Sequence, residues 1–154
     1  MKSKKVFLII GAVISALIAV LHFILGLKPE LYALIAPGQM SALSEMAVEG
    51  SSLTTILSFV IALIFALWAL YAFSGAGVIA RFPALRAALI VIGVIYCLRG
   101  LFLITEIGMV RNEGYPFRFV LFSSLSLIAG LLYLIGVFGN RSLPRRTKHV
   151  DSPK

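Results

Sequence analysis

The sequence predicts an all-α membrane protein, an antiparallel bundle of four transmembrane helices, and three observations lead to this prediction. The chain of 154 residues is 60% hydrophobic and only 13% charged, whereas a soluble domain is about half apolar and about a quarter charged. Four long apolar segments contain almost none of the charged residues, and Lys and Arg are shared unevenly between the connections. This composition excludes a water-soluble globule and an intrinsically disordered chain.

Each of the four apolar segments is long enough to cross a bilayer, which takes about 20 helical residues. None shows the alternation of apolar and polar residues that marks the strands of a transmembrane barrel. We therefore expect a single four-helix domain over residues 1–140 and a basic tail over residues 141–154, which is predicted to be disordered. The predicted spans cover residues 6–26, 53–73, 84–105 and 119–139.

The distribution of Lys and Arg predicts the orientation. Ten of the 14 lie in the N-terminal segment, the connection between the second and third spans, and the tail, whereas three lie in the other two connections. The positive-inside rule then places both termini in the cytoplasm. The first apolar segment is too long for a signal peptide and has no A-x-A cleavage motif, so we expect it to be retained. The net charge of +8 reflects topology, and we expect no nucleic-acid partner.

The first outer connection, residues 27–52, is longer than most loops, and long connections tend to be functional or to hold structure of their own. Pro29 to Ala36 and Ser41 to Gly50 are predicted to form short amphipathic helices at the membrane surface. Glu45 and Glu49 lie on one face of the second helix. Two interpretations remain open, a surface connector and a lid over a pocket.

Arg99 is the most informative residue, because an Arg near the centre of a span costs about 2.5 to 3.5 kcal/mol on insertion scales and needs a partner or water. Glu106 follows seven residues later on the same helix face, about 10 Å away along the axis, so contact requires the Arg side chain to reach or a water to bridge. Three hypotheses remain open: a structural ion pair, an Arg that binds an anion, and an Arg that extends to the membrane surface.

Small and polar residues recur at steps of three and four in the spans, among them Ser15, Ser58 and Ser123, and these faces are predicted to form the interior of the bundle. Other polar side chains are predicted to lie with Arg99 in the outer half of the bundle. His22 is expected to hydrogen-bond a serine or the Arg99 network, with a proton-relay role as the alternative. A metal site is not supported, because the only other histidine, His149, lies in the tail, and no cofactor is expected. The candidate ligand-binding residues are Arg99, His22, Tyr96, Glu106, Ser58 and Ser126, and the candidate lid residues are Glu45 and Glu49.

Several classes of membrane enzyme are excluded by missing residues. Asp151, in the tail, is the only aspartate, and Cys97 is the only cysteine, so paired aspartates and thiol pairs are absent. The chain also has no P-loop, H-E-x-x-H or G-x-S-x-G motif. The remaining enzyme hypothesis makes His22 the acid or base, oriented by Glu106 or Glu45, with Arg99 stabilising an anion.

One set of segments resembles a known kind of protein. The stretch Ala69–Gly77 (ALYAFSGAG), followed by Pro83–Arg86 and then Tyr96–Gly100 (YCLRG), resembles a signature of small four-helix bacterial inner-membrane proteins without an assigned function. The similarity extends over residues 6–139. It implies the four-span fold and the bacterial inner membrane as the location, and it implies no activity and no site residue.

Two main function hypotheses follow. The first is the binding, and movement, of a small amphipathic or lipid-like ligand whose head lies in the outer polar layer and whose tail lies among the apolar spans. The second is a structural or accessory subunit that docks on a larger membrane complex or on a second copy of the chain. Trp68 and the phenylalanine-rich outer faces are the candidate contacts for docking.

Overall fold

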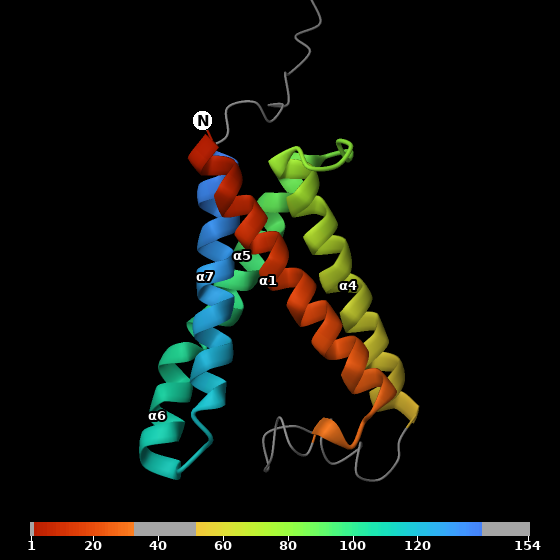
Figure 1. Ribbon diagram of the computed structural model, residues 1–154. Helices are drawn as coiled ribbons and strands as arrows, with labels where there is room; N and C mark the ends of the chain where they lie inside the picture. The colour runs from red at the N-terminus through yellow and green to blue at the C-terminus, as the bar shows by residue number, and fades with distance from the viewer. Residues whose placement is uncertain (1, 33–51, 140–154) are drawn as a thin grey trace, which may run out of the picture.

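The structure is a computed structural model that describes residues 2–32 and 52–139. These ranges form α-helices and contain no β-strand. Four helical segments, Lys5–Leu27, Ser52–Ala76, Leu85–Glu113 and Arg118–Gly139, are long and apolar enough to span a membrane, which confirms the all-helical prediction with four spans. The helices in chain order are α1 (Lys2–Leu27), α4 (Ser52–Ala76), α5 (Leu85–Leu101), α6 (Leu103–Glu113) and α7 (Arg118–Gly139) (Figure 1).

Some predictions fall outside these ranges. Of the short helix predicted over Pro29–Ala36, only residues 29–32 are described, and the helix predicted over Ser41–Gly50, the lid residues Glu45 and Glu49, and the tail from residue 141 lie outside the described residues. The beginning of that connection is described as far as Tyr32, whose side chain is buried.

The third apolar helical segment continues beyond the predicted span. Its two helices continue to Glu113, whereas the sequence predicted an end at residue 105. The helix continues past residue 105 because no residue with a left-handed backbone follows until Gly114, whose φ is +71°. The N–H of this cap donates to the Met109 carbonyl. Phe102 interrupts the span, since its N–H bonds the carbonyls of Arg99 and Gly100 and α6 begins only at the next residue.

The helices associate as two pairs, α1 with α4 and α5 with α7, which are joined by contacts of α1 with α7 and of α4 with α5. The two pairs approach each other near the N-terminus of α1 and diverge toward the end at which α4 begins and α6 lies (Figure 1). A Cβ on Gly75, near the end of α4, would lie 3.2 Å from Leu8 at the start of α1. A Cβ on Gly26, at the end of α1, would lie 2.9 Å from Phe59 near the start of α4.

Glycines allow the closest helix approach, which lies between α5 and α7. A Cβ on Gly130 would lie 2.7 Å from the Cys97 nitrogen and 2.8 Å from the Gly93 carbonyl oxygen. A Cβ on Gly100 would lie 2.7 Å from the Cα of Leu127. Small residues at such positions let membrane helices pack through their backbones. The small and polar faces predicted to form the interior are buried here, with Ser15, Ser58 and Ser123 all 0% exposed.

The connection from α4 to α5 is held by one side chain. The Ser74 hydroxyl donates to the Ala80 carbonyl at 2.8 Å and accepts from the Phe82 N–H at 3.0 Å. Gly77 supplies the positive φ of +76° that lets the chain turn after α4. The turn at this end of the bundle is thus fixed by its own hydrogen bonds.

Gly130→Ala should separate α5 from α7, because the added methyl meets backbone atoms that cannot rotate away. We expect the free energy of unfolding to fall by about 1 to 3 kcal/mol, the usual cost of overpacking, when it is measured by SDS titration in mixed micelles. Gly108→Ala on α6 is the matched control, because a Cβ there meets nothing within 4 Å. Equal stability of the two variants would contradict the close contact at Gly130.

Candidate functional site

All four spans meet at a chain of hydroxyl groups in the middle of the bundle. The Ser15 hydroxyl of α1 lies 2.8 Å from the hydroxyl of Tyr96 on α5 and 2.8 Å from that of Tyr133 on α7. The Tyr133 hydroxyl donates to the Trp68 carbonyl of α4 at 3.1 Å. Ser15 and Tyr133 are 0% exposed, so these groups depend on one another for hydrogen bonds.

The proton order in this chain follows from its last acceptor. The Trp68 carbonyl only accepts, so the single proton of Tyr133 goes to it. Tyr133 must then accept from Ser15, and Ser15, having used its own proton, must accept from Tyr96. Each of the three hydroxyl protons therefore has an acceptor, and the chain is directed from α5 through α1 and α7 to α4.

An aromatic cluster lies beside the hydroxyl chain. The Trp68 ring lies 5.1 Å from that of Tyr96 and 5.0 Å from that of Phe65, between ring centroids, in edge-on contacts. The ring of His22 stacks on Phe65 at 5.7 Å. Edge-on aromatic pairs contribute to packing beyond their buried area. Trp68, expected from the sequence as an outer docking contact, thus places its ring against the aromatic residues of the interior.

His22 is held by its own helix. Its Nδ1 lies 2.9 Å from the Ile18 carbonyl oxygen, which can only accept, so Nδ1 carries the proton in the neutral ring. Nε2 is then an acceptor, and it has no hydrogen-bond partner among the described residues. Glu106 makes its ion pair with Arg99 and not with His22, so orientation of His22 by Glu106 is absent from the described contacts, whereas Glu45, the other orienting residue considered, lies outside the described residues.

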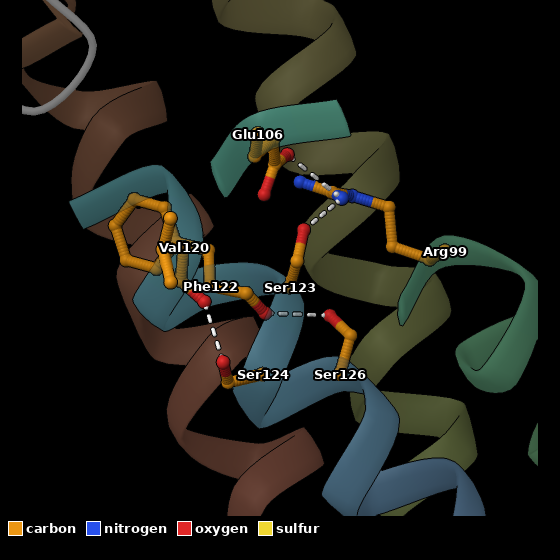
Figure 2. A network of polar contacts seen from close by, with 7 residues as sticks. All are labelled: Arg99, Glu106, Val120, Phe122, Ser123, Ser124 and Ser126. Atoms are coloured by element: carbon orange, nitrogen blue, oxygen red, sulfur yellow. Dashed lines mark hydrogen bonds and ion pairs between the residues drawn. The ribbon is translucent and has the colours of Figure 1, made fainter. Parts of the chain in front are cut away.

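Arg99, Glu106 and Ser123 form a second polar cluster, with one residue each from α5, α6 and α7 (Figure 2). The Nη1 of Arg99 donates to Oε1 of Glu106 at 3.2 Å and to the Ser123 hydroxyl at 2.5 Å. The sequence placed the two charged residues about 10 Å apart along a regular helix. They meet directly because the extended Arg side chain reaches along the span past its interruption at Phe102.

This cluster leaves several polar groups without partners among the described residues. Both hydrogen bonds of Arg99 leave from Nη1, so the edge formed by Nε–H and Nη2–H makes no hydrogen bond with a described residue. The Arg99 side chain is 44% exposed. The Glu106 side chain is only 8% exposed, and its Oε2 is buried with no donor. The Ser123 hydroxyl accepts from Arg99, which leaves its own proton for another acceptor.

The remaining predicted site residues lie elsewhere. Ser58 accepts from the Tyr32 hydroxyl at 2.8 Å and donates to the Thr54 carbonyl at 2.6 Å, so it belongs to a separate cluster at the start of α4. Ser126 donates to the Phe122 carbonyl of its own helix, and Ser124 does the same with Val120 (Figure 2). Of the six candidate ligand-binding residues, the structure therefore brings only Arg99 and Glu106 into direct contact.

The sequence prediction did not include Tyr133, Tyr32 or Ser123 among the candidate site residues. Ser123 could have been selected, because it lies seven residues before Gly130 and so shares the small face of its helix. Nothing in the sequence marks Tyr133 as the partner of Ser15, since periodicity indicates which face of a helix is buried and does not indicate which helix packs against it.

Comparisons with known proteins identify no relative. No family model, no curated protein and no solved structure gives a significant match to the chain. Among residues 2–32 and 52–139, no group of three or more His, Cys, Asp or Glu side chains is arranged to hold a metal ion. The chemistry of the site is therefore inferred from the contacts of its own residues.

Tyr133→Phe should destabilise the bundle more than Tyr96→Phe. The first variant removes two hydrogen bonds and leaves the Ser15 proton without its acceptor, whereas the second removes only the bond to Ser15. We expect losses in the free energy of unfolding of about 1 to 2 kcal/mol and about 0.6 kcal/mol, typical of hydrogen bonds between membrane helices.

The same SDS titration measures both variants, and Tyr71→Phe is the control, because the Tyr71 hydroxyl makes no hydrogen bond within the described ranges while its ring packs on Phe82. A larger loss for Tyr96→Phe than for Tyr133→Phe would show that the proton order is different.

Proposed function

We propose that the protein is a multi-pass protein of the bacterial inner membrane that binds a small amphipathic ligand, whose head group carries a phosphate or carboxylate that is held by Arg99 in the outer half of the bundle. The four spans cross as an antiparallel bundle with both termini in the cytoplasm. The proposal includes movement of the bound ligand across the membrane or out of it.

The orientation is supported by charge and by the positions of the connections. The start of α1 and the connection between α4 and α5 lie at the same end of the bundle (Figure 1), and that end carries Lys5, Arg81 and Arg86. The opposite end carries fewer basic residues, among them Arg111. The end with more Lys and Arg is assigned to the cytoplasm.

The observation that carries the binding proposal is the open edge of the Arg99 guanidinium. An Arg inside a span is costly, and a purely structural Arg would be expected to use its donors on the protein. Here Nε and Nη2 make no hydrogen bond within the described ranges, and the side chain is half-exposed, so a ligand can reach it. Two parallel N–H groups on one guanidinium edge match the two oxygens of a carboxylate or phosphate.

The position of the cluster suits a head group with an apolar tail. The guanidinium reaches the carboxylate of Glu106, which precedes the end of α6 at Glu113 by about 10 Å of helix. The third span has 29 residues, about 44 Å of helix, which is close to the roughly 40 to 45 Å of a bilayer with its head groups, so we place this depth near the boundary between head groups and acyl chains. Leu98 and Phe102, the large apolar neighbours of Arg99 along the chain, are 57% and 60% exposed and would contact an acyl tail.

The proposed orientation can be tested by cysteine labelling in a Cys97→Ala background. Asn112→Cys at the end of α6 and Val78→Cys between α4 and α5 both place the thiol at an exposed position. In intact cells, a membrane-impermeant maleimide should label Asn112→Cys and should label Val78→Cys only after the cells are broken. Labelling of both variants in intact cells would exclude the proposed topology.

The binding proposal can be tested with Arg99→Lys, which keeps a positive charge for Glu106 but removes the two-pronged edge. We expect the full-length protein in detergent to bind a phospholipid about tenfold or more weakly, since a hydrogen bond to a charged group contributes about 1.5 to 3 kcal/mol. Native mass spectrometry during a lipid titration measures this affinity.

Arg111→Lys is the matched control, because Arg111 is exposed near the end of α6. Unchanged lipid affinity in Arg99→Lys, or an equal loss in both variants, would exclude Arg99 as the binding residue.

A further inference from the structure

We infer that the head group recognised at Arg99 is zwitterionic, with a phosphate bound by the guanidinium edge and a primary ammonium bound by Glu106, as in an aminophospholipid. This inference rests on the proposed function and names its ligand class. It is carried by the partnerless groups of the Arg99, Glu106 and Ser123 cluster, taken together with the charge of the cluster.

Charge balance favours a zwitterion over an anion. The paired Arg99 and Glu106 have opposite charges in contact at 3.2 Å, so the cluster is close to neutral before a ligand arrives. An anionic head without an amine would leave a net negative charge beside the Glu106 carboxylate, which is costly in a medium of low dielectric. A head with one negative and one positive group adds no net charge.

The unused donors of the cluster match a phosphate. Nε and Nη2 of Arg99 make no hydrogen bond among the described residues. The Ser123 side chain is 0% exposed, and its hydroxyl accepts from Nη1 of Arg99, so it holds the guanidinium and leaves the edge of Nε and Nη2 to the ligand. Arg99 and Ser123 come from α5 and α7, whose spacing is fixed by close backbone packing at Gly100 and Gly130.

The unused acceptor of the cluster matches a primary ammonium. Oε2 of Glu106 is buried and has no donor, and a carboxylate oxygen without hydrogen bonds is expensive away from water. The terminal torsion of a Glu side chain is broad, so rotation of the carboxylate can present this oxygen to a ligand. A primary ammonium has three N–H donors for it, whereas the quaternary ammonium of choline has none.

The test compares three phospholipids with identical acyl chains, titrated into the full-length protein and measured by native mass spectrometry. Phosphatidylethanolamine should bind at least about tenfold more tightly than phosphatidylcholine, whose phosphate is the same but whose nitrogen cannot donate. It should also bind more tightly than the anionic phosphatidylglycerol. Equal binding of the ethanolamine and choline lipids, or tightest binding of the glycerol lipid, would overturn the inference.

A second test removes the negative charge of Glu106. Glu106→Gln removes the acceptor charge and leaves Arg99 unpaired, so the preference should shift from the ethanolamine lipid to the glycerol lipid. Glu113→Gln, the same substitution at the exposed end of α6, should keep the wild-type preference. An unchanged preference in Glu106→Gln would overturn the inference, and if that variant does not remain monodisperse, the lipid series on the wild-type protein decides alone.

Two further results separate this inference from the proposed function. If Arg99→Lys weakens the binding of all three lipids but the ethanolamine and choline lipids bind equally, only the zwitterion inference fails. If Arg99→Lys leaves all three affinities unchanged, the proposed function fails as well. Glycerophosphoethanolamine, which has the head group without acyl chains, should not compete at equal concentration, and effective competition would exclude a lipid as the ligand.

Discussion

The hydrogen bonds around Ser15 are the interaction on which the rest of the bundle depends. A bilayer interior offers no water to polar groups, so each must find a partner within the protein. The directed chain from Tyr96 through Ser15 and Tyr133 to the Trp68 carbonyl takes one group from each of the four spans. A shift of any one span would leave at least one of these groups unpaired, so this chain fixes the helices relative to one another.

Close backbone packing between α5 and α7 also fixes the positions of the residues in the Arg99 cluster. Gly93 and Gly130 hold α5 against α7 next to Tyr133, and about two turns further along, Gly100 lies against the backbone of Leu127. Arg99 precedes Gly100, and Ser123 lies one turn before Leu127, so the contact that brings the two backbones together also brings these side chains together. The short distance between the Arg99 guanidinium and the Ser123 hydroxyl is therefore a consequence of helix packing, which a larger residue at Gly100 would disturb.

The sequence predicted the spans and their buried faces, because length, hydropathy and helical period are local properties. It did not predict which faces meet. Ser15 was recognised as part of a small interior stripe, but its partners Tyr96 and Tyr133 depend on how the helix pairs associate, which no periodicity encodes. The contact between Arg99 and Glu106 takes one of the two forms that the sequence allowed, since the Arg side chain reaches the carboxylate directly, but the sequence could not decide between direct contact and a bridging water.

The hydroxyl chain around Ser15 and the Arg99 cluster differ in how completely they use their hydrogen-bonding groups. In the hydroxyl chain every proton has an acceptor within the protein, as expected where the only task is to hold helices together. In the Arg99 cluster, Nε and Nη2 of the guanidinium and Oε2 of Glu106 have no partner among the described residues. Both clusters lie within membrane spans, where unpaired polar groups are costly. A purely structural lock would be under the same pressure to pair them, so the unpaired groups at Arg99 are better explained by a partner from outside the chain.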